Sequence, residues 1–169
     1  MSGDHDIAVI GMAGRFPGAA DPDALWCNIR DGVGSIRHWT LDELRANGVP
    51  EPLVADPAFV GANGPLDGFA AFDPEFFGIG PKDAAIMDPQ HRQLLEVAWE
   101  ALEDAGYPPE RFDGDIGVFA GCGMGSYFLH NVMANDDLVA AEGLFSLRHT
   151  GNDKDFLPTR ISHALDLGG

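Results

Sequence analysis

Residues 121–125 read Gly-Cys-Gly-Met-Gly, and their thiol is the better of two candidate nucleophiles in the chain. A thiol attacks as the thiolate and needs a base within hydrogen-bond reach. No neighbouring residue identifies a partner base for Cys122, so we expect a small, buried and unreactive side chain there. Cys27 lies beside Trp26 in a predicted helix, and we expect it to belong to the core.

The same glycines could bring a backbone close to the pyrophosphate of a dinucleotide at a helix N-terminus. Their spacing is G-x-G-x-G, whereas that site typically uses G-x-G-x-x-G followed by an acidic residue about twenty positions later. We therefore favour a tight turn after a buried strand. A nucleotide-binding oxidoreductase stays as an alternative, which calorimetry with a dinucleotide would test.

Histidines and carboxylates form no recognisable catalytic or metal-binding set. The six histidines, at positions 5, 38, 91, 130, 149 and 163, lack the spacing that a zinc site uses. We expect His91, in the first turn of a helix, to be neutral or solvated. Asp153 and Asp155 flank Lys154, a pattern more typical of a helix start or an ion pair than of an acid–base dyad.

The clearest structural element is a helix from Asp88 to Gly106. Asp88 can cap it, Pro89 can occupy its first position, and Gly106 can end it. Its apolar side chains recur every three or four residues, at Leu94, Leu95, Ala98, Trp99, Leu102 and Ala105. This spacing predicts one buried face on an amphipathic helix.

Two short apolar runs, residues 6–12 and 115–120, predict strands buried on both faces. A helix is expected from Asp21 to Gly32, partly helical structure over 126–147, and a short helix over 155–165. The prolines and glycines of residues 33–80 predict an irregular excursion. Strands alternating with helices indicate an α/β layered fold.

Composition excludes several classes of function. The 169 residues fit one domain, and a net charge of −17, from 27 acidic and 10 basic residues, disfavours nucleic-acid binding. No apolar stretch is long enough to span a membrane, and the first residues lack a signal peptide, so we expect a cytoplasmic protein. Two cysteines predict reduced thiols and no disulfide framework.

Five segments in register resemble the N-terminal half of the β-ketoacyl synthase (ketosynthase) domain of modular type I polyketide synthases. They are residues 7–18 (IAVIGMAGRFPG), 72–78 (FDPEFFG), the 88–106 helix, 116–121 (IGVFAG), and 151–155 with 159–162 (GNDKD and TRIS). Their order and spacing agree with those of the family across nearly the whole chain.

The resemblance implies a thiolase-like fold with α-β-α-β-α layers, of which this chain supplies roughly the first half, and a homodimeric domain. It also implies an acyltransferase-class enzyme of polyketide and fatty acid biosynthesis. That family catalyses a decarboxylative Claisen condensation between an acyl thioester and a malonyl-type extender. Substrates arrive on the phosphopantetheine of an acyl carrier protein, and an acyltransferase domain is expected in the same polypeptide. No cofactor or metal is expected to bind this chain directly.

The sequence departs from the family at its end, because Gly169 falls just before the strand that carries the family's nucleophilic cysteine. Cys122 is not that residue, and none of the six histidines matches the two catalytic ones. We thus expect residues 1–169 to be the N-terminal part of the domain, truncated before the nucleophile strand. Such a piece would contain no catalytic residue, would be inactive alone, and would expose the apolar runs that start at Ile7 and Ile116.

By its position in the glycine loop, Met124 would be the side chain nearest the substrate, or else a flexible filler of the core. Residues 145–156 would approach the pocket of the other subunit. The alternative to the enzyme is a non-catalytic ketosynthase-like scaffold module that binds a carrier protein or a dimer partner.

Overall fold

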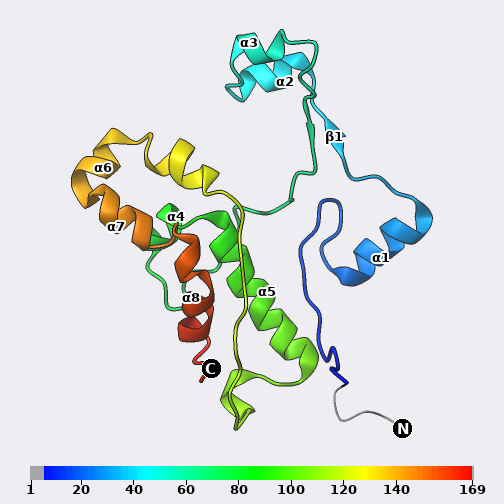
Figure 1. Cartoon of the computed structure of the whole chain (residues 1–169), viewed down its shortest axis with the longest axis vertical. Coiled ribbons are helices and arrows are strands. Elements are labelled where there is room, and N and C mark those ends of the chain that lie inside the picture. The colour runs from blue at the N-terminus through cyan, green and yellow to red at the C-terminus, as the bar shows by residue number, and fades with distance from the viewer. Residues whose placement is uncertain (1–5, 169) are drawn as a thin grey trace. The chain divides into compact units, whose positions relative to one another are not determined.

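A computed structural model describes residues 6–168 of the chain. These residues form two compact units, which are described separately (Figure 1). The first unit combines the segment that ends at Ala13 with the chain from Phe69 onward, and the second spans Gly14–Gly68. Across the described residues, no helix is both long and apolar enough to cross a membrane.

Helix α5, Pro89–Ala105, organises the first unit and confirms the helix predicted there. The Asp88 carboxylate accepts the backbone N–H of Gln90 at 2.8 Å, Pro89 begins the helix, and Gly106 ends it at a φ of 74°. A left-handed residue in that position favours glycine, because a side chain would be strained there. Local capping chemistry therefore sets both ends of the helix.

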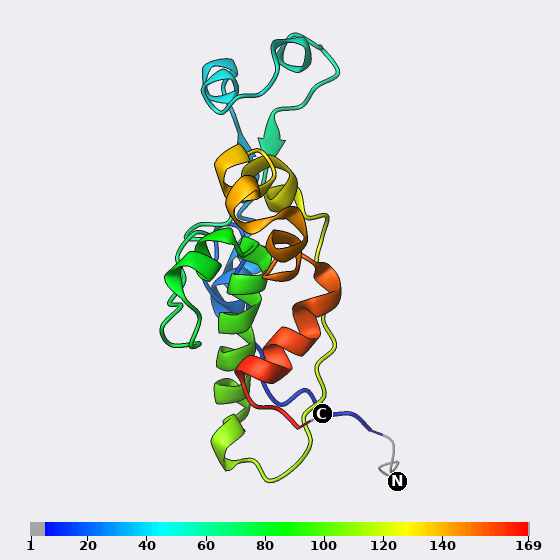
Figure 2. The ribbon, with the colours of Figure 1, turned by 90° about the vertical axis from the view of Figure 1, so that its left-hand side faces the viewer.

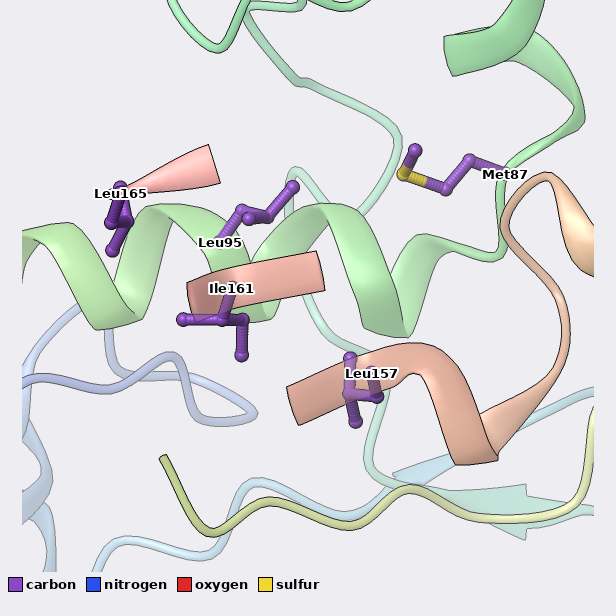
Figure 3. Packing of buried hydrophobic residues seen from close by; sticks show 5 residues of the cluster. All are labelled: Met87, Leu95, Leu157, Ile161 and Leu165. Atoms are coloured by element: carbon purple, nitrogen blue, oxygen red, sulfur yellow. The ribbon is translucent and has the colours of Figure 1, made fainter. Parts of the chain in front are cut away.

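The main core lies between α5 and helix α8, Leu157–Ala164 (Figures 2 and 3). Five buried side chains make up this cluster: Met87, Leu95, Leu157, Ile161 and Leu165. Burial of a side chain of this kind contributes roughly 1.5–3 kcal/mol relative to its exposed state. The core is thus built by one helix packing on another, and α8 agrees with the helix expected over 155–165.

A second cluster joins Ile86, Val132 and Leu147. These residues come from α4 (Pro81–Ile86), the π-helical turn η2 (Phe128–Val132) and α7 (Leu144–His149). Helix α6 (Asp136–Glu142) lies between η2 and α7 in the chain. The partly helical character predicted for residues 126–147 is confirmed. Two short 3-10 turns, η1 (Pro109–Arg111) and η3 (Lys154–Phe156), complete the unit.

The second unit begins with α1, Pro22–Asp31, as predicted. Its cap Asp21 accepts the N–H of Ala24 at 2.7 Å, and Gly32 ends it with a φ of 68°. The expectation that Cys27 is a core residue is wrong, because its side chain is exposed. Helix α1 carries no buried residue, since nothing in its own unit covers it fully.

The rest of the second unit contains a two-stranded antiparallel sheet and two short helices. Strands β1 (Arg37–His38) and β2 (Ala62–Asn63) pair antiparallel, with helices α2 (Leu41–Ala46) and α3 (Glu51–Val54) between them. Thr40 and Glu43 cap α2 reciprocally. The sequence predicted only irregular structure here, although the Thr-x-x-Glu spacing is a known signal for a helix start.

The strands predicted over residues 6–12 and 115–120 are absent from the described structure. Both segments are extended, and Ile7 and Phe119 are 96% and 99% exposed. A buried strand needs partner strands to satisfy its backbone and cover its side chains. Residues 6–168 supply helices beside these segments but no partner strand. The prediction of buried strands is therefore wrong, and the expected exposure of the apolar runs is confirmed.

Candidate functional site

A cavity of about 570 Å³ lies against the glycine loop and is the best candidate site in the first unit. Its lining combines apolar, thiol and charged side chains from four segments: Asp88, residues 122–125, Phe128 with Leu129, and Arg148 with residues 152–154. A groove of about 650 Å³ borders the extended segments and α5, but Asp115 is its one charged lining residue. That groove offers a packing surface and little chemistry.

The first turn of α5 holds the glycine loop in place. Gln90 accepts the backbone N–H of Gly123 at 2.8 Å through its side-chain oxygen. The Asp88 carboxylate, which is almost fully buried, receives both the backbone and the side-chain N–H of Gln90. The residue that caps the helix therefore also orients the side chain that fixes the loop.

The opposite wall is fixed by Gly151 and Asn152. The Asp88 N–H donates to the Gly151 carbonyl at 2.9 Å, and the Asn152 amide donates to the carbonyls of Ile86 and Leu147, each at 2.8 Å. A Cβ on Gly151 would lie 2.6 Å from the Cγ of Met87, so a larger residue does not fit. In the sequence, Gly151 and Asn152 stand out only as part of a family motif, and the motif does not predict these contacts.

The structure places Met124 and Cys122 on the same cavity. The Met124 side chain is 78% exposed, so within the described residues it does not fill the core. Cys122 is half-buried, packs against the main core and forms no disulfide. Burial, followed by the negative charge of Asp88, raises the pKa of the Cys122 thiol. A protonated thiol at neutral pH agrees with the expectation of an unreactive cysteine.

His91, whose backbone N–H donates to the Asp88 carbonyl at 2.9 Å, is only 1% exposed, so a solvated ring is not what the structure shows. Neither ring nitrogen has a hydrogen-bond partner among the described residues. Burial lowers the pKa of His91, and the positive charge of Arg160 lowers it further, whereas Asp88 and Asp153 act in the opposite direction. A lowered pKa favours the neutral ring expected here.

Because His91 is buried and its pKa is lowered, we expect the stability of the folded protein to depend on pH. Because the pKa of the folded state lies below the ordinary value of 6.5, the unfolded chain takes up the proton first as the pH falls. Stability from this group is complete above pH 6.5 and is lost as the pH falls further, with a limiting slope of about 1.4 kcal/mol per pH unit. Urea unfolding at several pH values between 5 and 8 gives the free energy of unfolding as a function of pH. This free energy should fall less steeply with falling pH in His91→Gln than in the wild type. An equal pH dependence in the two proteins would contradict this assignment.

Asp153 confirms the expectation of an ion pair and a helix start. Its carboxylate pairs with the Arg148 guanidinium, with 3.0 Å between Oδ2 and Nε, and accepts the N–H of Asp155 at 3.4 Å. No group of three potential metal ligands occurs within residues 6–168, and His5 lies outside that range. The site therefore consists of a shaped cavity, one thiol that stays protonated at neutral pH and an ion pair.

Comparison with known proteins identifies the family. A family model described as "Beta-ketoacyl synthase, N-terminal domain" matches residues 4–169. A phenolphthiocerol/phthiocerol polyketide synthase from Mycobacterium tuberculosis is 52% identical over 172 aligned residues, which cover 98% of this chain and 12% of that protein. Polyketide synthase PksN of Bacillus subtilis is 39% identical and also matches 98% of this chain, but only 3% of its own length.

Solved structures agree in fold. Ketosynthase twelve from the bacillaene polyketide synthase of Bacillus amyloliquefaciens matches with a TM-score of 0.78 and 37% identity, over 96% of this chain and 28% of that one. The ketosynthase from module 1 of the bacillaene synthase of the same species matches with a TM-score of 0.75 and 39% identity, over 96% of this chain and 27% of that one. The chain thus spans about an eighth of the mycobacterial relative and just over a quarter of these solved chains. The fold is thiolase-like, as the resemblance implied, and the chain belongs to the β-ketoacyl synthase family as the N-terminal portion of a polyketide synthase ketosynthase domain.

Proposed function

We propose that this chain forms part of the acyl-binding wall of a ketosynthase that catalyses decarboxylative Claisen condensation. The observation that carries the proposal is the cavity beside residues 122–125, which the first turn of α5 and the Gly151 loop hold in place. Its volume, about 570 Å³, lies within the roughly 300–1,000 Å³ range of small-molecule sites. Met124 is the exposed apolar side chain of the loop and would contact the acyl chain.

The reacting groups would come from outside residues 1–169. A cysteine thiolate there would take the acyl group from a carrier-protein thioester and release the phosphopantetheine thiol. The malonyl-type extender would then lose CO2, and the resulting carbanion would attack the acyl-enzyme carbonyl and expel the cysteine thiolate. Two histidines would stabilise the charge that develops. Residues of this chain would bind and orient the acyl group.

The same proposal specifies the partners and the setting. An acyl carrier protein would deliver both substrates on phosphopantetheine, a second copy of the domain would complete a homodimer, and an acyltransferase domain of the same polypeptide would supply the extender. The relatives named above are polyketide synthases of which this chain matches only 12% and 3%, which supports such a multidomain arrangement. The proposed location is the cytoplasm.

Acyl uptake tests the proposal. The whole reading frame that encodes this chain should be expressed and incubated with a radiolabelled acyl thioester, and the labelled peptide identified by mass spectrometry. We expect one acyl group on a cysteine outside residues 1–169, and the same labelled peptide in Cys122→Ser and in the matched control Cys27→Ser. Label on the Cys122 peptide would contradict the assignment. No uptake at all would favour the scaffold module instead.

A further inference from the structure

A second cavity, of about 500 Å³, adjoins the one beside the glycine loop. Three residues line both cavities: Phe128, Arg148 and Asp153. Because these residues border both spaces, they lie where the two spaces meet, and this boundary is the wall between them. Arg148 and Asp153 are joined in that wall by the ion pair described above, with 3.0 Å between Nε and Oδ2.

The chemistry of the second cavity suits a hydrocarbon. Its remaining lining residues are Met133, Leu144, Phe145 and His149. Part of the segment 145–156, which was expected to approach the pocket of the other subunit, thus lines a cavity of its own subunit. The rings of Phe145 and His149 lie 4.0 Å apart between centroids, and the His149 Nδ1 contacts the Phe145 carbonyl oxygen at 2.7 Å. The only ionised carboxylate and guanidinium in the lining are those of the dividing pair. An apolar chain entering this space would therefore meet favourable surface once past Arg148 and Asp153.

The two members of the pair differ in their freedom to move. The Asp153 side chain is 11% exposed and also caps η3, so it is held in place. The Arg148 side chain is 60% exposed. An ion pair with one solvated partner is weak, because water can replace the contact. Arg148 can thus turn toward solvent while Asp153 stays fixed.

We propose that the Arg148–Asp153 ion pair is a partition that limits how far an acyl chain extends from the cavity of Met124 into the aromatic cavity of Phe145. This inference rests on the proposed function for its substrate class, which is a saturated or aromatic-ended acyl chain. With the pair closed, short chains fill the first cavity. With Arg148 turned outward, longer chains reach the second cavity, and Arg148 becomes a residue that determines chain-length specificity.

A tethering experiment tests the partition without requiring enzymatic activity. Cys122 lines the first cavity, so methyl and dodecyl methanethiosulfonates can place a short or a long chain there. The Cys122 thiolate forms a disulfide with the alkylthio group, and methanesulfinate leaves. The whole reading frame carrying Cys27→Ser is used at alkaline pH, because the raised pKa of Cys122 leaves little thiolate at neutral pH. Modification of the Cys122 peptide is followed by mass spectrometry.

We expect Arg148→Ala to raise the ratio of dodecyl to methyl modification rates by about tenfold, which corresponds to roughly two newly buried methylenes. Arg148→Lys keeps a cation and should change the ratio little. Lys82→Ala is the matched control, because it breaks the Lys82–Glu142 ion pair of the same unit, which lines neither cavity. An unchanged ratio in Arg148→Ala, or an equal change in Lys82→Ala, would overturn the partition.

Acyl uptake separates this inference from the function on which it rests. If the wild type takes up acyl groups, Arg148→Ala should shift its preference from acetyl toward dodecanoyl thioesters, and an unshifted preference would overturn the partition. If no form of the protein takes up acyl groups, the proposed function fails. The tethering ratio would then still decide whether the ion pair divides the two cavities.

Discussion

Gly11→Ala should lower the free energy of unfolding by about 1–3 kcal/mol, because it overpacks the contact between the N-terminal segment and α5. A Cβ at this position would lie 2.5 Å from the Ala101 carbonyl oxygen and 2.7 Å from the Ala105 backbone nitrogen. These are backbone atoms of a helix and cannot move aside as a side-chain end can. The segment would have to withdraw, and the hydrogen bond from the Met12 N–H to Asp104 would lengthen or break.

Gly121→Ala is the matched control for this change. No atom lies within 4 Å of a Cβ at Gly121, and its φ is not positive, so alanine should fit without strain. Urea unfolding should separate the two variants, and hydrogen exchange should show weaker protection of the last turns of α5 in Gly11→Ala only. Equal stability of the two variants would show that the segment does not pack closely on the helix.

The features that the sequence predicted correctly are those with local causes. The ends of α5 follow from Asp88, Pro89 and Gly106, which act on the residues next to them. Helix α1 follows in the same way from Asp21 and Gly32. Such capping interactions need no knowledge of the rest of the fold, because both partners are within a few residues of each other.

The strand predictions failed because a strand is not a local structure. The apolar run at 116–120 has the composition of a buried strand. It can form a strand only beside a partner strand, which the described residues do not supply. The prediction that Cys27 is a core residue failed for a similar reason. Its helix has an apolar side, but burial requires another element to cover that side.

The sequence predicted where the candidate site lies, but it did not predict the contacts that hold the site together. The family resemblance pointed to Met124 and the glycine loop. It did not reveal the Gln90 contact to Gly123, which spans 33 residues, or the Asn152 contact to Ile86, which spans 66. Hydrogen bonds between distant segments leave no periodic pattern. The burial of His91 was missed because a histidine in a first helical turn is equally compatible with solvent.

Met124→Trp should reduce acyl uptake by at least about tenfold, since a single methylene in an apolar pocket already alters selectivity by roughly 10–200-fold. The Met124 side chain is 78% exposed and lines the cavity of about 570 Å³, so an indole can occupy that space without disturbing the core. The melting temperature should therefore stay close to that of the wild type. Val60→Trp is the matched control, because Val60 is 71% exposed, does not line this cavity and lies outside the apolar runs that a neighbouring strand would cover.

The most direct test of the central claim, that the cavity of Met124 receives the acyl group, is the rate of acyl uptake by the whole reading frame in these two variants. We predict that Met124→Trp loses at least about nine-tenths of the wild-type rate, whereas Val60→Trp keeps it. Undiminished uptake by a folded Met124→Trp protein would contradict the claim, because the acyl group would then bind elsewhere.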